Sequence, residues 1–462
     1  MKKVHFMGVG GSGANAAASI ADAMGFEVSG CDMKESEYTH DLQKNSIPLS
    51  VGHDIAHLKN IDILCVSPAL FDVQPRPDEM KEAMKHGITI QTWQEFMGIY
   101  LQKEKDVVAI AGTKGKSTTT SLMGVLLETA GLDPLVQVGA KVIDWQKNYR
   151  LGNGKYFVCE ADEFNNNFLH YRPKIAVITN LEMDHPEFFK SFDAYLDSFV
   201  SFTRMLPEDG VLVANTDSHG VQQLLSLLGE VPFRVFTYGT AQSVDILLES
   251  EETVDGMTSF TLSGYEDEPS HFLTKLTGSH NISNILAIIS VASILDIPAS
   301  VVRDTLASFS GIGRRFELIC DVGGIKVFND YAHNPMSVAA ALQGARSRYP
   351  DSRVWAVFQP HMYTRTKMFL EEFAHSFNDA NEVIVLEIFA SREKGSPIAQ
   401  EIDSQALVDR IFNVNPKLHV RSIPAKEKAV EVLLAELKTG DIVVNMGAGD
   451  NGIITEMLKS KL

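Results

Sequence analysis

The 462-residue sequence is poor in cysteine, in basic residues and in long apolar runs, and each shortage excludes a class of protein. Its four cysteines, Cys31, Cys65, Cys159 and Cys320, lie far apart and form no C-x-x-C pair. We therefore expect a reduced, cytoplasmic protein whose cysteines are small core residues. No signal-peptide pattern precedes the first expected strand. The longest apolar helix candidate, near residues 285–295, is shorter than the roughly 20 residues of a membrane span, so we expect no membrane association.

The chain is also acidic, with 41 Lys and Arg against 59 Asp and Glu and a formal net charge of −18. The resulting field repels nucleic acid and anionic membranes, so neither is an expected partner. An acidic protein that binds phosphates must concentrate positive charge locally and use metal ions. At about 150 residues per domain, the length indicates three domains.

The most informative stretch is VVAIAGTKGKSTTT, at residues 107–120. It predicts a buried strand, a tight turn and a helix whose N-terminal N–H groups can hold phosphates. Gly112 and Gly115 let the backbone approach a ligand, and Lys116 adds a charge for the outer phosphates. The hydroxyl of Ser117 can bind Mg²⁺. The spacing is a shortened form of the usual phosphate loop, and the alternative is an ordinary strand–turn–helix with a surface lysine.

A second glycine-rich turn, G-x-G-x-x-G, lies near the N-terminus at residues 8–13. It follows a short strand, precedes an alanine-rich helix, and is followed by Asp32 at the end of a second strand. This is the layout of a dinucleotide-binding unit, and a nicotinamide oxidoreductase is the obvious interpretation. However, the unit ends near Gln102, which is short for a dehydrogenase, and the diphosphate of a nucleotide-sugar suits the turn equally well. Residues 102–106 are the expected linker.

Polar side chains follow two expected strands of the central unit, 157–159 and 175–179. Because ligands of open parallel sheets bind at the carboxyl ends of the strands, these side chains indicate a magnesium site. His185 is a less usual magnesium ligand, and its alternative role is loop packing. The residues at these strand ends are Glu160, Asp162, Asn180, Glu182, Asp184 and His185.

Two further features leave alternatives open. Asn281 and Asn284 are spaced to project from one face of a helix start, where they could contact a ligand or cap the helix. Arg314 and Arg315 could form a solvated loop or could reach the phosphates. Beyond residue 311 strands again alternate with helical stretches, which predicts a third, doubly wound unit.

Seven motifs occur in the order known from one family. They are GTKGKSTTT, EADE, TNLEMDH, GSHNISN, GRRFE, DYAHNP and FQPHMYTRT. On these motifs the chain resembles the Mur ligases, the ATP-dependent amino-acid ligases of peptidoglycan synthesis. The stretches HFMGVGGSG, VSGCD, VSPAL, FQPHMYTRT and MGAGD are most similar to the branch that adds L-alanine to UDP-N-acetylmuramate.

The resemblance implies an α/β fold of three domains. Residues 1–105 would form a Rossmann-like domain for the UDP-sugar. Residues 106–311 would form a P-loop ATPase domain with a mostly parallel sheet. Residues 312–462 would form a Rossmann-like domain for the amino acid and the nucleotide. The cofactors would be ATP and Mg²⁺, the substrates UDP-N-acetylmuramate and L-alanine, and the protein a monomer or homodimer.

The resemblance also assigns roles to single residues. Lys116, Glu160, His185 and Arg315 would be catalytic, and Ser117, Glu160 and His185 would hold the metal. The ATP site would comprise Gly112, Thr113, Lys114, Gly115, Lys116, Ser117, Thr118, Asn281, Asn284, Arg315 and Asp330. The substrate site would comprise Gly8, Gly10, Gly11, Ser12, Gly13, Asp32, Ser67, Asn180, Tyr331, His333, His361 and Arg365.

The sequence departs from the family pattern at a few positions. Lys114 and Ser117 replace the His and Thr common in the phosphate loop of the alanine-adding branch, Met362 stands where some members have an arginine, and Asn334 replaces a histidine. Residues 163–165 also differ from the acidic-serine continuation that is usual in the family. These departures bear on which amino acid is added. The alternatives are a ligase that adds a preformed murein tripeptide, and a non-catalytic ATP-binding switch.

Overall fold

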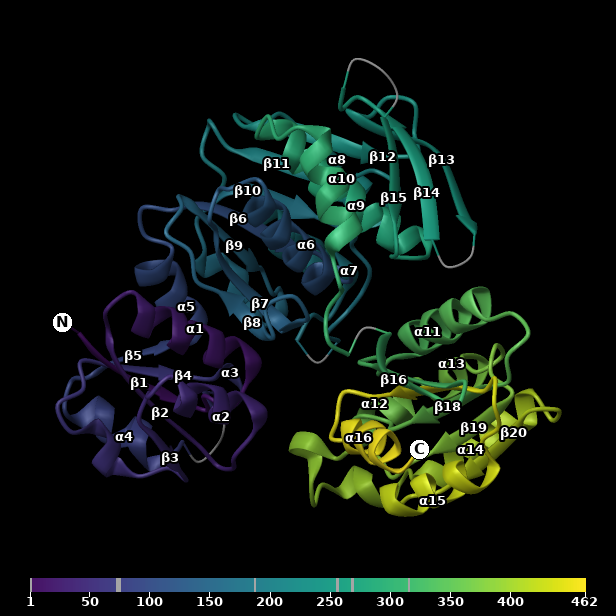
Figure 1. Cartoon of the computed structure of the whole chain (residues 1–462). Coiled ribbons are helices and arrows are strands. Elements are labelled where there is room, and N and C mark those ends of the chain that lie inside the picture. The colour runs from purple at the N-terminus through teal and green to yellow at the C-terminus, as the bar shows by residue number, and fades with distance from the viewer. Residues whose placement is uncertain (1, 72–75, 187, 255–256, 267–269, 315) are drawn as a thin grey trace. The chain divides into compact units, whose positions relative to one another are not determined.

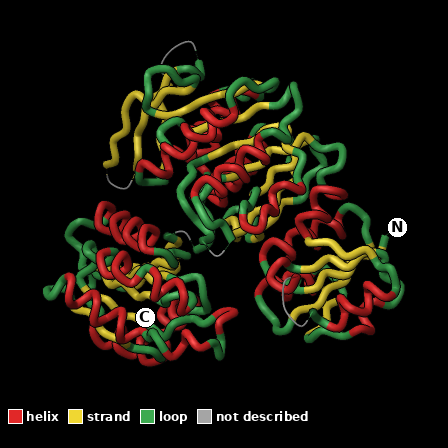
Figure 2. Tube along the Cα trace, turned by 180° about the vertical axis from the view of Figure 1, so that it is seen from behind, coloured by secondary structure: helices red, strands yellow, loops and turns green. Residues whose placement is uncertain are grey.

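The computed structural model describes residues 2–71, 76–186, 188–254, 257–266, 270–314 and 316–462. It contains three sheets with helices packed against their faces (Figures 1 and 2). Two compact units are formed, Met1–Ser310 with two of the sheets and Gly311–Leu462 with the third. This arrangement confirms the predicted α/β class.

The N-terminal sheet has five parallel strands in the order β3-β2-β1-β4-β5. The strands are β1 (Lys3–Met7), β2 (Glu27–Asp32), β3 (Leu49–Val51), β4 (Ile63–Val66) and β5 (Thr89–Thr92). The helices are α1 (Ser12–Ala23), α2 (Glu37–Lys44), η1 (Ile55–Leu58), α3 (Pro68–Phe71), α4 (Asp78–Lys85), α5 (Trp93–Phe96) and η2 (Met97–Leu101). Because α1 is rich in small alanines, it packs closely on one sheet face, while α4 and η1 contribute to the core of the other.

The central sheet has ten strands in the order β15-β14-β13-β12-β11-β10-β6-β9-β7-β8. Its middle is parallel, and β13–β15 at one end and β8 at the other pair antiparallel. The strands are β6 (Asp106–Ala111), β7 (Leu135–Val142), β8 (Lys147–Arg150), β9 (Tyr156–Glu160), β10 (Pro173–Ile178), β11 (Val211–Asn215), β12 (Arg234–Gly239), β13 (Ile246–Val254), β14 (Met257–Ser263) and β15 (Ser270–Thr274). The helices are α6 (Lys116–Thr129), η3 (Phe164–His170), α7 (Phe192–Thr203), α8 (His219–Leu228), α9 (Ser279–Ile294) and α10 (Ala299–Ser308).

The C-terminal sheet has six strands in the order β16-β17-β21-β18-β19-β20, with β16 antiparallel at its edge. The strands are β16 (Glu317–Val322), β17 (Ile325–Asp330), β18 (Val354–Phe358), β19 (Glu382–Val385), β20 (His419–Ser422) and β21 (Ile442–Met446). The helices are α11 (Pro335–Arg348), α12 (Tyr363–Met368), α13 (Leu370–His375), η4 (Ser391–Glu393), η5 (Pro397–Gln400), α14 (Ser404–Val414), α15 (Lys426–Glu436) and α16 (Gly452–Lys461).

The predicted linker at residues 102–106 is packed rather than free. Gln102 is buried and its side-chain amide donates to Cys159 Sγ in the central sheet. The N-terminal and central sheets are joined further by hydrogen bonds from Asn148 to the carbonyl of Ser12 and from Tyr149 to Asp41. These contacts explain why the first two sheets form one compact unit. The predicted boundaries after residues 105 and 311 remain predictions.

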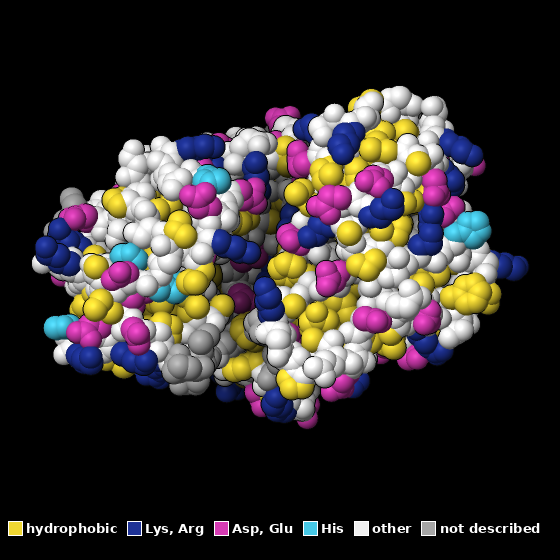
Figure 3. All heavy atoms as spheres, turned by 90° about the horizontal axis from the view of Figure 1, so that it is seen from below, with side chains coloured by type: hydrophobic (Ala, Val, Ile, Leu, Met, Phe, Trp, Pro, Cys, Tyr) yellow, Lys and Arg dark blue, Asp and Glu magenta, His cyan; other side chains and the backbone are white. Residues whose placement is uncertain are grey.

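The cysteines are unpaired, and most of them lie in the protein interior, as predicted. The four cysteines are free, and Cys31, Cys65 and Cys159 are buried while Cys320 is partly buried. Over the described ranges, no helix combines the length and apolarity that a membrane crossing requires. On the face seen in Figure 3, acidic and basic side chains are interspersed, so positive charge for an anion must come from specific residues.

Candidate active site

The phosphate loop joins the buried strand β6 to helix α6 in the central sheet. Gly112 and Gly115 have φ angles of +132° and +84°, which a residue with a Cβ rarely adopts. A Cβ at Gly112 would lie 2.3 Å from Thr179 Oγ1, and one at Gly115 would lie 2.3 Å from Asn284 Oδ1. The two glycines are therefore required both for the turn and for close packing. Helix α6 begins at Lys116, so this lysine lies in its first turn, behind the loop.

Lys116 is held inside the loop by an ion pair. Its Nζ lies 3.0 Å from Glu163 Oε2 and also donates to the carbonyl of Gly112. Burial opposes the charge of this lysine, but Glu163, Asp162 and Glu160 outweigh burial and raise its pKa. The side chain is therefore an ammonium group at neutral pH, as a phosphate ligand must be.

Glu163 is held in turn by the hydroxyl group of Tyr195, which also contacts the hydroxyl group of Thr113. Tyr195 donates to Glu163 Oε1 at 3.1 Å, and the hydroxyl groups of Tyr195 and Thr113 are 2.9 Å apart. Glu163 is completely buried. The lysine, the carboxylate and the loop residue Thr113 thus form one connected network with helix α7.

Residues that follow strand β10 make hydrogen bonds to the phosphate loop. Asn180 Oδ1 accepts from the N–H of Lys114 at 3.0 Å, and Asn180 Nδ2 donates to the carbonyl of Lys114 at 2.9 Å. Lys114 Nζ reaches Glu182 Oε2 at 2.6 Å. These bonds give Asn180 a role in shaping the phosphate loop, and its predicted role in substrate binding remains a prediction. The added charge of Lys114 is balanced by Glu182.

Carboxylates and a histidine meet beside the loop, although the grouping differs from the predicted metal set. Potential ligand atoms of Asp162, Glu163 and His185 all lie within 4.8 Å of one another. Glu160 instead accepts from the N–H of Gly139 at 2.5 Å. Ser117 follows Lys116 in the first turn of α6. The roles of Ser117, Glu160 and His185 in metal binding remain predictions.

Helix α9 contributes the two predicted asparagines. Asn284 is buried against Gly115, which places it at the phosphate loop. Asn281 is partly buried and its amide donates to the carbonyl of Thr277 at 2.9 Å, closing the turn before the helix. Of the two, Asn284 is the one that the fold brings to the loop. Thr118, the remaining predicted loop residue, lies in α6.

The N-terminal glycine turn contains a second strand–turn–helix junction. The N–H of Gly10 donates to Asp32 Oδ2 at 2.8 Å. Gly8 has a φ of +82°, and a Cβ there would lie 2.8 Å from Ser67 Cβ. The structure therefore brings together Gly8, Gly10, Asp32 and Ser67, as predicted.

The end of the same turn forms the start of helix α1. Gly11 is the N-cap of the helix, and Ser12 is its first residue. A Cβ at Gly13 would lie 2.3 Å from the Trp93 ring, so only glycine allows α1 to pack on α5 at this point. Gly11, Ser12 and Gly13 thus lie at a helix start, where N–H groups without helical partners can hold an anion.

In the C-terminal unit, Asp330 ends strand β17. Its two carboxylate oxygens accept from the N–H groups of Phe316 at 2.7 Å and Ala332 at 2.8 Å. These bonds shape the strand end. The prediction that Asp330 meets the nucleotide ribose remains a prediction.

The four residues predicted to bind the amino acid form one cluster. The ring centroids of Tyr331 and His333 are 5.2 Å apart, and those of His333 and His361 are 6.1 Å apart. Arg365 Nη1 lies 3.4 Å from His361 Nδ1, and Phe389 stacks on His361. The motifs around residues 331 and 361 are distant in sequence, and the parallel sheet brings them together.

Of the two arginines at the start of this unit, the structure describes Arg314. Arg315 lies outside the described residues. Arg314 donates to the carbonyl of Gly447 at 2.6 Å, and its guanidinium lies over the ring of Tyr331 at 5.0 Å. Arg314 therefore braces the strand ends within its own unit.

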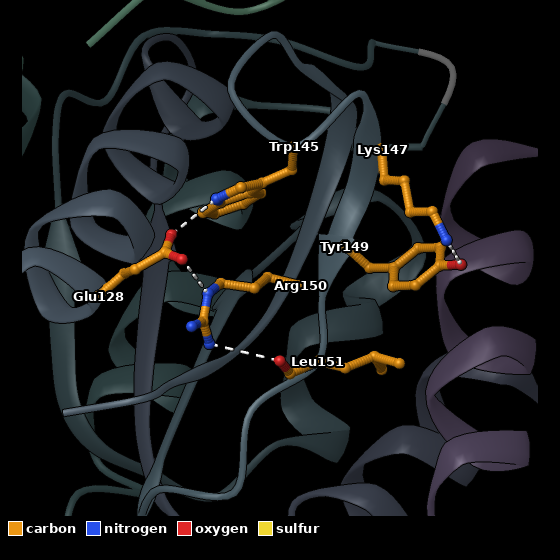
Figure 4. Close-up of a pocket in the computed structure, with 6 residues that line it drawn as sticks. All are labelled: Glu128, Trp145, Lys147, Tyr149, Arg150 and Leu151. Atoms are coloured by element: carbon orange, nitrogen blue, oxygen red, sulfur yellow. Dashed lines mark hydrogen bonds and ion pairs between the residues drawn. The ribbon is translucent and has the colours of Figure 1, made fainter. Parts of the chain in front are cut away.

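A separate hollow lies beside the β7–β8 hairpin (Figure 4). Trp145 and Arg150 both contact Glu128 there, while Lys147 donates to Tyr149. It contains no residue that the sequence analysis assigned to a site. The candidate active site is thus defined by the strand ends and not by this hollow.

Sequence reasoning missed the network behind Lys116. Glu163 belongs to the EADE motif after β9 and to the segment that departs from the family pattern, but neither observation predicts its pairing with Lys116. Tyr195 gave no signal, because a tyrosine among the apolar positions of a helix is typical of a core residue. Glu182 was noted at its strand end without its partner Lys114.

Comparison with known families covers nearly the whole chain. Residues 3–105 match the Mur ligase family catalytic domain, and residues 110–292 match the Mur ligase middle domain. Residues 314–449 match the Mur ligase glutamate ligase domain. The three matches follow the three sheets.

Individual proteins agree with this result. The chain is 34% identical to the UDP-N-acetylmuramate–L-alanine ligase of Alkaliphilus metalliredigens, over 99% of this chain and 97% of that protein. It is 38% identical to the ligase of the same name from Anaeromyxobacter, over 97% and 95%. The crystal structure of UDP-N-acetylmuramate-alanine ligase from Thermotoga maritima has a TM-score of 0.84 at 26% identity, covering 100% and 99% of the two chains. A murein peptide ligase from Psychrobacter arcticus has a TM-score of 0.74 at 25% identity, covering 100% and 98%. The phosphate loop, the strand-end residues and these full-length similarities together establish that the chain belongs to the Mur ligase family of ATP-dependent ligases.

Proposed function

We propose that this protein joins L-alanine to the lactyl carboxylate of UDP-N-acetylmuramate in an ATP-dependent reaction. The observation that carries the proposal is the phosphate loop with its buried ammonium group, in a chain whose full-length relatives bear this activity in their names. The reaction would supply a cytoplasmic precursor of peptidoglycan. The protein would act as a monomer or homodimer.

The proposed reaction has two steps. A carboxylate oxygen of the sugar attacks the γ-phosphorus of ATP, and ADP leaves, which gives an acyl phosphate. The amine of L-alanine then attacks the acyl carbon, phosphate leaves with the former carboxylate oxygen, and the amine loses a proton. Such chemistry needs positioning and charge neutralisation more than covalent help from the protein.

Lys116 would neutralise the outer phosphates, because its position in the first turn of α6 and its raised pKa make it a fixed positive charge. Gly112, Thr113, Lys114, Gly115 and Thr118 would line the phosphate site, in which the free N–H groups at the start of α6 would face the phosphates. Asn281, Asn284, Arg315 and Asp330 would complete the nucleotide site.

Mg²⁺ would be held by Ser117, Glu160 and His185. The donor chemistry fits, because hydroxyl and carboxylate oxygens are hard ligands, and His185 already lies near Asp162 and Glu163. When bound, the ion would offset the charge that develops on the transferred phosphoryl group.

The substrates would occupy the other two domains. The turn formed by Gly8, Gly10, Gly11, Ser12 and Gly13, with Asp32 and Ser67, would hold the UDP end of the sugar. The cluster of Tyr331, His333, His361 and Arg365 would hold L-alanine, with the guanidinium of Arg365 facing the carboxylate of the amino acid.

The test is phosphate release from ATP with Mg²⁺ and UDP-N-acetylmuramate, adding L-alanine, L-serine, glycine or the murein tripeptide in turn. Release with L-alanine, and a product heavier by one alanyl residue, is the expected result. Release with L-serine or glycine instead would keep the chemistry and change the specificity. No release with any nucleophile would contradict the proposal and favour an ATP-binding switch.

The second candidate is ligation of the tripeptide, which the structural likeness to a murein peptide ligase favours. Two observations rank it lower. The TM-score to that ligase is lower than the TM-score to the alanine ligase, and the stretch FQPHMYTRT at residues 358–366 is typical of the alanine-adding branch. Release with the tripeptide and not with L-alanine would reverse the ranking.

A further inference from the structure

A cluster of metal-binding residue types lies in the N-terminal sheet, apart from the glycine turn and the phosphate loop. Ligand atoms of His5 on β1, Cys31 on β2, His57 on η1 and Glu79 on α4 all lie within 4.8 Å of one another. The four residues come from four separate elements. His5, Cys31 and Glu79 are almost completely buried, and His57 is partly buried.

The atoms of the cluster converge on one small volume. His5 Nε2 lies 3.2 Å from Cys31 Sγ, and His57 Nδ1 lies 2.6 Å from Glu79 Oε1. Cys31 Sγ and Glu79 Oε1 are 3.9 Å apart, and the rings of His5 and His57 are stacked with centroids 5.0 Å apart. Four ligands in a tetrahedron around Zn²⁺, at about 2.0–2.3 Å from the ion, lie roughly 3.3–3.8 Å from one another. The observed spacings need only small side-chain movements to match this geometry.

The buried carboxylate of Glu79 has only imidazoles as basic partners in the described chain. Glu79 is 1% exposed, and these partners are His53 and His57. Glu79 Oε2 lies 3.3 Å from His53 Nδ1 without a hydrogen bond, and the buried His53 Nε2 makes no hydrogen bond to a described residue. Burying a carboxylate without full compensation is costly. A divalent cation beside a carboxylate and a thiolate would give a neutral site.

A neighbouring side chain orients one histidine as a ligand. His5 Nδ1 lies 2.9 Å from Ser29 Oγ, while His5 Nε2 faces Cys31. Metal-binding histidines usually donate one ring N–H to such a partner and present the other nitrogen to the ion. Ser29 is thus placed to select the tautomer that binds a metal.

We propose that His5, Cys31, His57 and Glu79 bind a structural Zn²⁺ ion. A mixed thiolate, imidazole and carboxylate set of four favours Zn²⁺ over Mg²⁺, which prefers oxygen ligands. Binding would transfer the thiol proton of Cys31 to solvent as the thiolate–zinc bond forms.

The site would fasten η1 and α4 to the sheet and stabilise the neighbouring glycine turn. The carbonyl of Cys31 accepts from the N–H groups of Gly8 at 2.9 Å and Val9 at 3.1 Å. Fixing Cys31 therefore fixes the strand end that holds this turn. This role concerns stability and does not depend on the proposed ligase reaction.

The first test is the metal content of the full-length protein, purified without added chelator or affinity tag that binds metal. Zinc at one equivalent per chain in the wild type, and its loss in Cys31→Ala, is the expected result. Cys65→Ala is the matched control, because Cys65 is an equally buried thiol that packs in the core on the other face of the same sheet. Wild-type protein that takes up no zinc, or zinc retained in Cys31→Ala, would overturn the proposal.

The second test uses Co²⁺ as a spectroscopic probe in the folded wild-type chain, so it does not depend on a variant that folds. A thiolate-to-Co²⁺ charge-transfer band, abolished by one equivalent of Zn²⁺, is expected. In Ser29→Ala, the affinity for Zn²⁺ should fall by roughly 10-fold, because the histidine loses its orienting partner. Absence of the band in the wild type would mean that the cluster is a hydrogen-bonded group without a metal.

Discussion

The first unit contains two glycine-rich turns with the same strand–turn–helix layout and different surroundings. One joins β1 to α1, and the other joins β6 to α6. In the N-terminal turn the carboxylate of Asp32 accepts from the N–H of Gly10, and no lysine follows the glycines. In the phosphate loop, Lys116 enters the first turn of the helix and is held by Glu163.

The comparison shows that a strand–turn–helix can form an anion site but does not determine which anion binds there. The free N–H groups at the helix start are common to both turns. We expect side chains from neighbouring strands to determine which anion binds, Asp32 on β2 in one case and Glu163 after β9 in the other. The glycine pattern alone is therefore consistent with a dehydrogenase, a nucleotide-sugar site or an ATP site.

The largest expected effect is the loss of Lys116. Lys116→Ala should reduce ATP-dependent phosphate release by roughly 100-fold or more, because a fixed charge at the transferred phosphate is removed. Circular dichroism should show that the fold survives. Lys155→Ala is the control, since Lys155 is an exposed lysine of the same domain that pairs with Asp106. Activity retained in Lys116→Ala would contradict the assignment of residues 112–118 as a phosphate-binding loop.

The N-terminal turn should respond differently. In Gly10→Ala the new Cβ would lie 2.7 Å from Asp32 Oδ2, so the turn must shift. We expect the KM for UDP-N-acetylmuramate to rise by about 10-fold, equivalent to roughly 1.4 kcal/mol, while the KM for ATP stays the same.

Gly344→Ala is the control for Gly10→Ala. Gly344 lies in α11, outside the assigned sites, and no atom lies within 4 Å of a Cβ there, so the substitution fits without a shift. Steady-state kinetics with each substrate varied separately distinguish the two turns. A rise in the KM for ATP in Gly10→Ala would contradict the separation of the two sites.

A smaller effect is expected on the pH dependence. Glu163 helps to raise the pKa of Lys116 against the effect of burial. In Glu163→Gln that support is lost, burial dominates, and the pKa of Lys116 should fall. Because the active form is the ammonium group, the alkaline limb of kcat/KM should move to lower pH. A limb that stays in place, measured with wild type in the same buffers, would argue against this coupling.

The smallest effect concerns the hydroxyl behind the loop. Tyr195→Phe removes the donor to Glu163 and should lower the free energy of unfolding by about 1 kcal/mol. Tyr171→Phe is the control, because the buried Tyr171 hydroxyl makes no hydrogen bond to any residue that the structure describes. Denaturant unfolding of both variants tests the difference, and equal losses would mean that the network does not stabilise the loop.

Much of the fold was predictable because its signals are local. The strands before Gly8 and Gly112 are apolar runs ended by glycines, and the helices after them have clear starts. The cluster of His333, His361 and Arg365 was expected from the resemblance to the family, and the fold accounts for it because parallel strand ends share one edge of a sheet. Resemblance to the family supplied the roles of these residues.

The remainder depends on contacts that sequence patterns do not encode. The pairing of Lys116 with Glu163 and Tyr195 joins three elements, and the bonds of Asn180 to the loop depend on the register of β10 beside β6. Likewise, residues 102–106 were expected to form a linker, but the hydrogen bond from Gln102 to Cys159 makes this segment part of a compact unit. Such details require the three-dimensional fold.

The central claim is that the carboxylate of the sugar is activated as an acyl phosphate. The most direct measurement follows ¹⁸O from the lactyl carboxylate of labelled UDP-N-acetylmuramate during turnover with ATP, Mg²⁺ and L-alanine. Our account predicts that each phosphate released carries one oxygen from that carboxylate, while the alanylated product retains the other. Phosphate released without the label, alongside formation of the product, would contradict it.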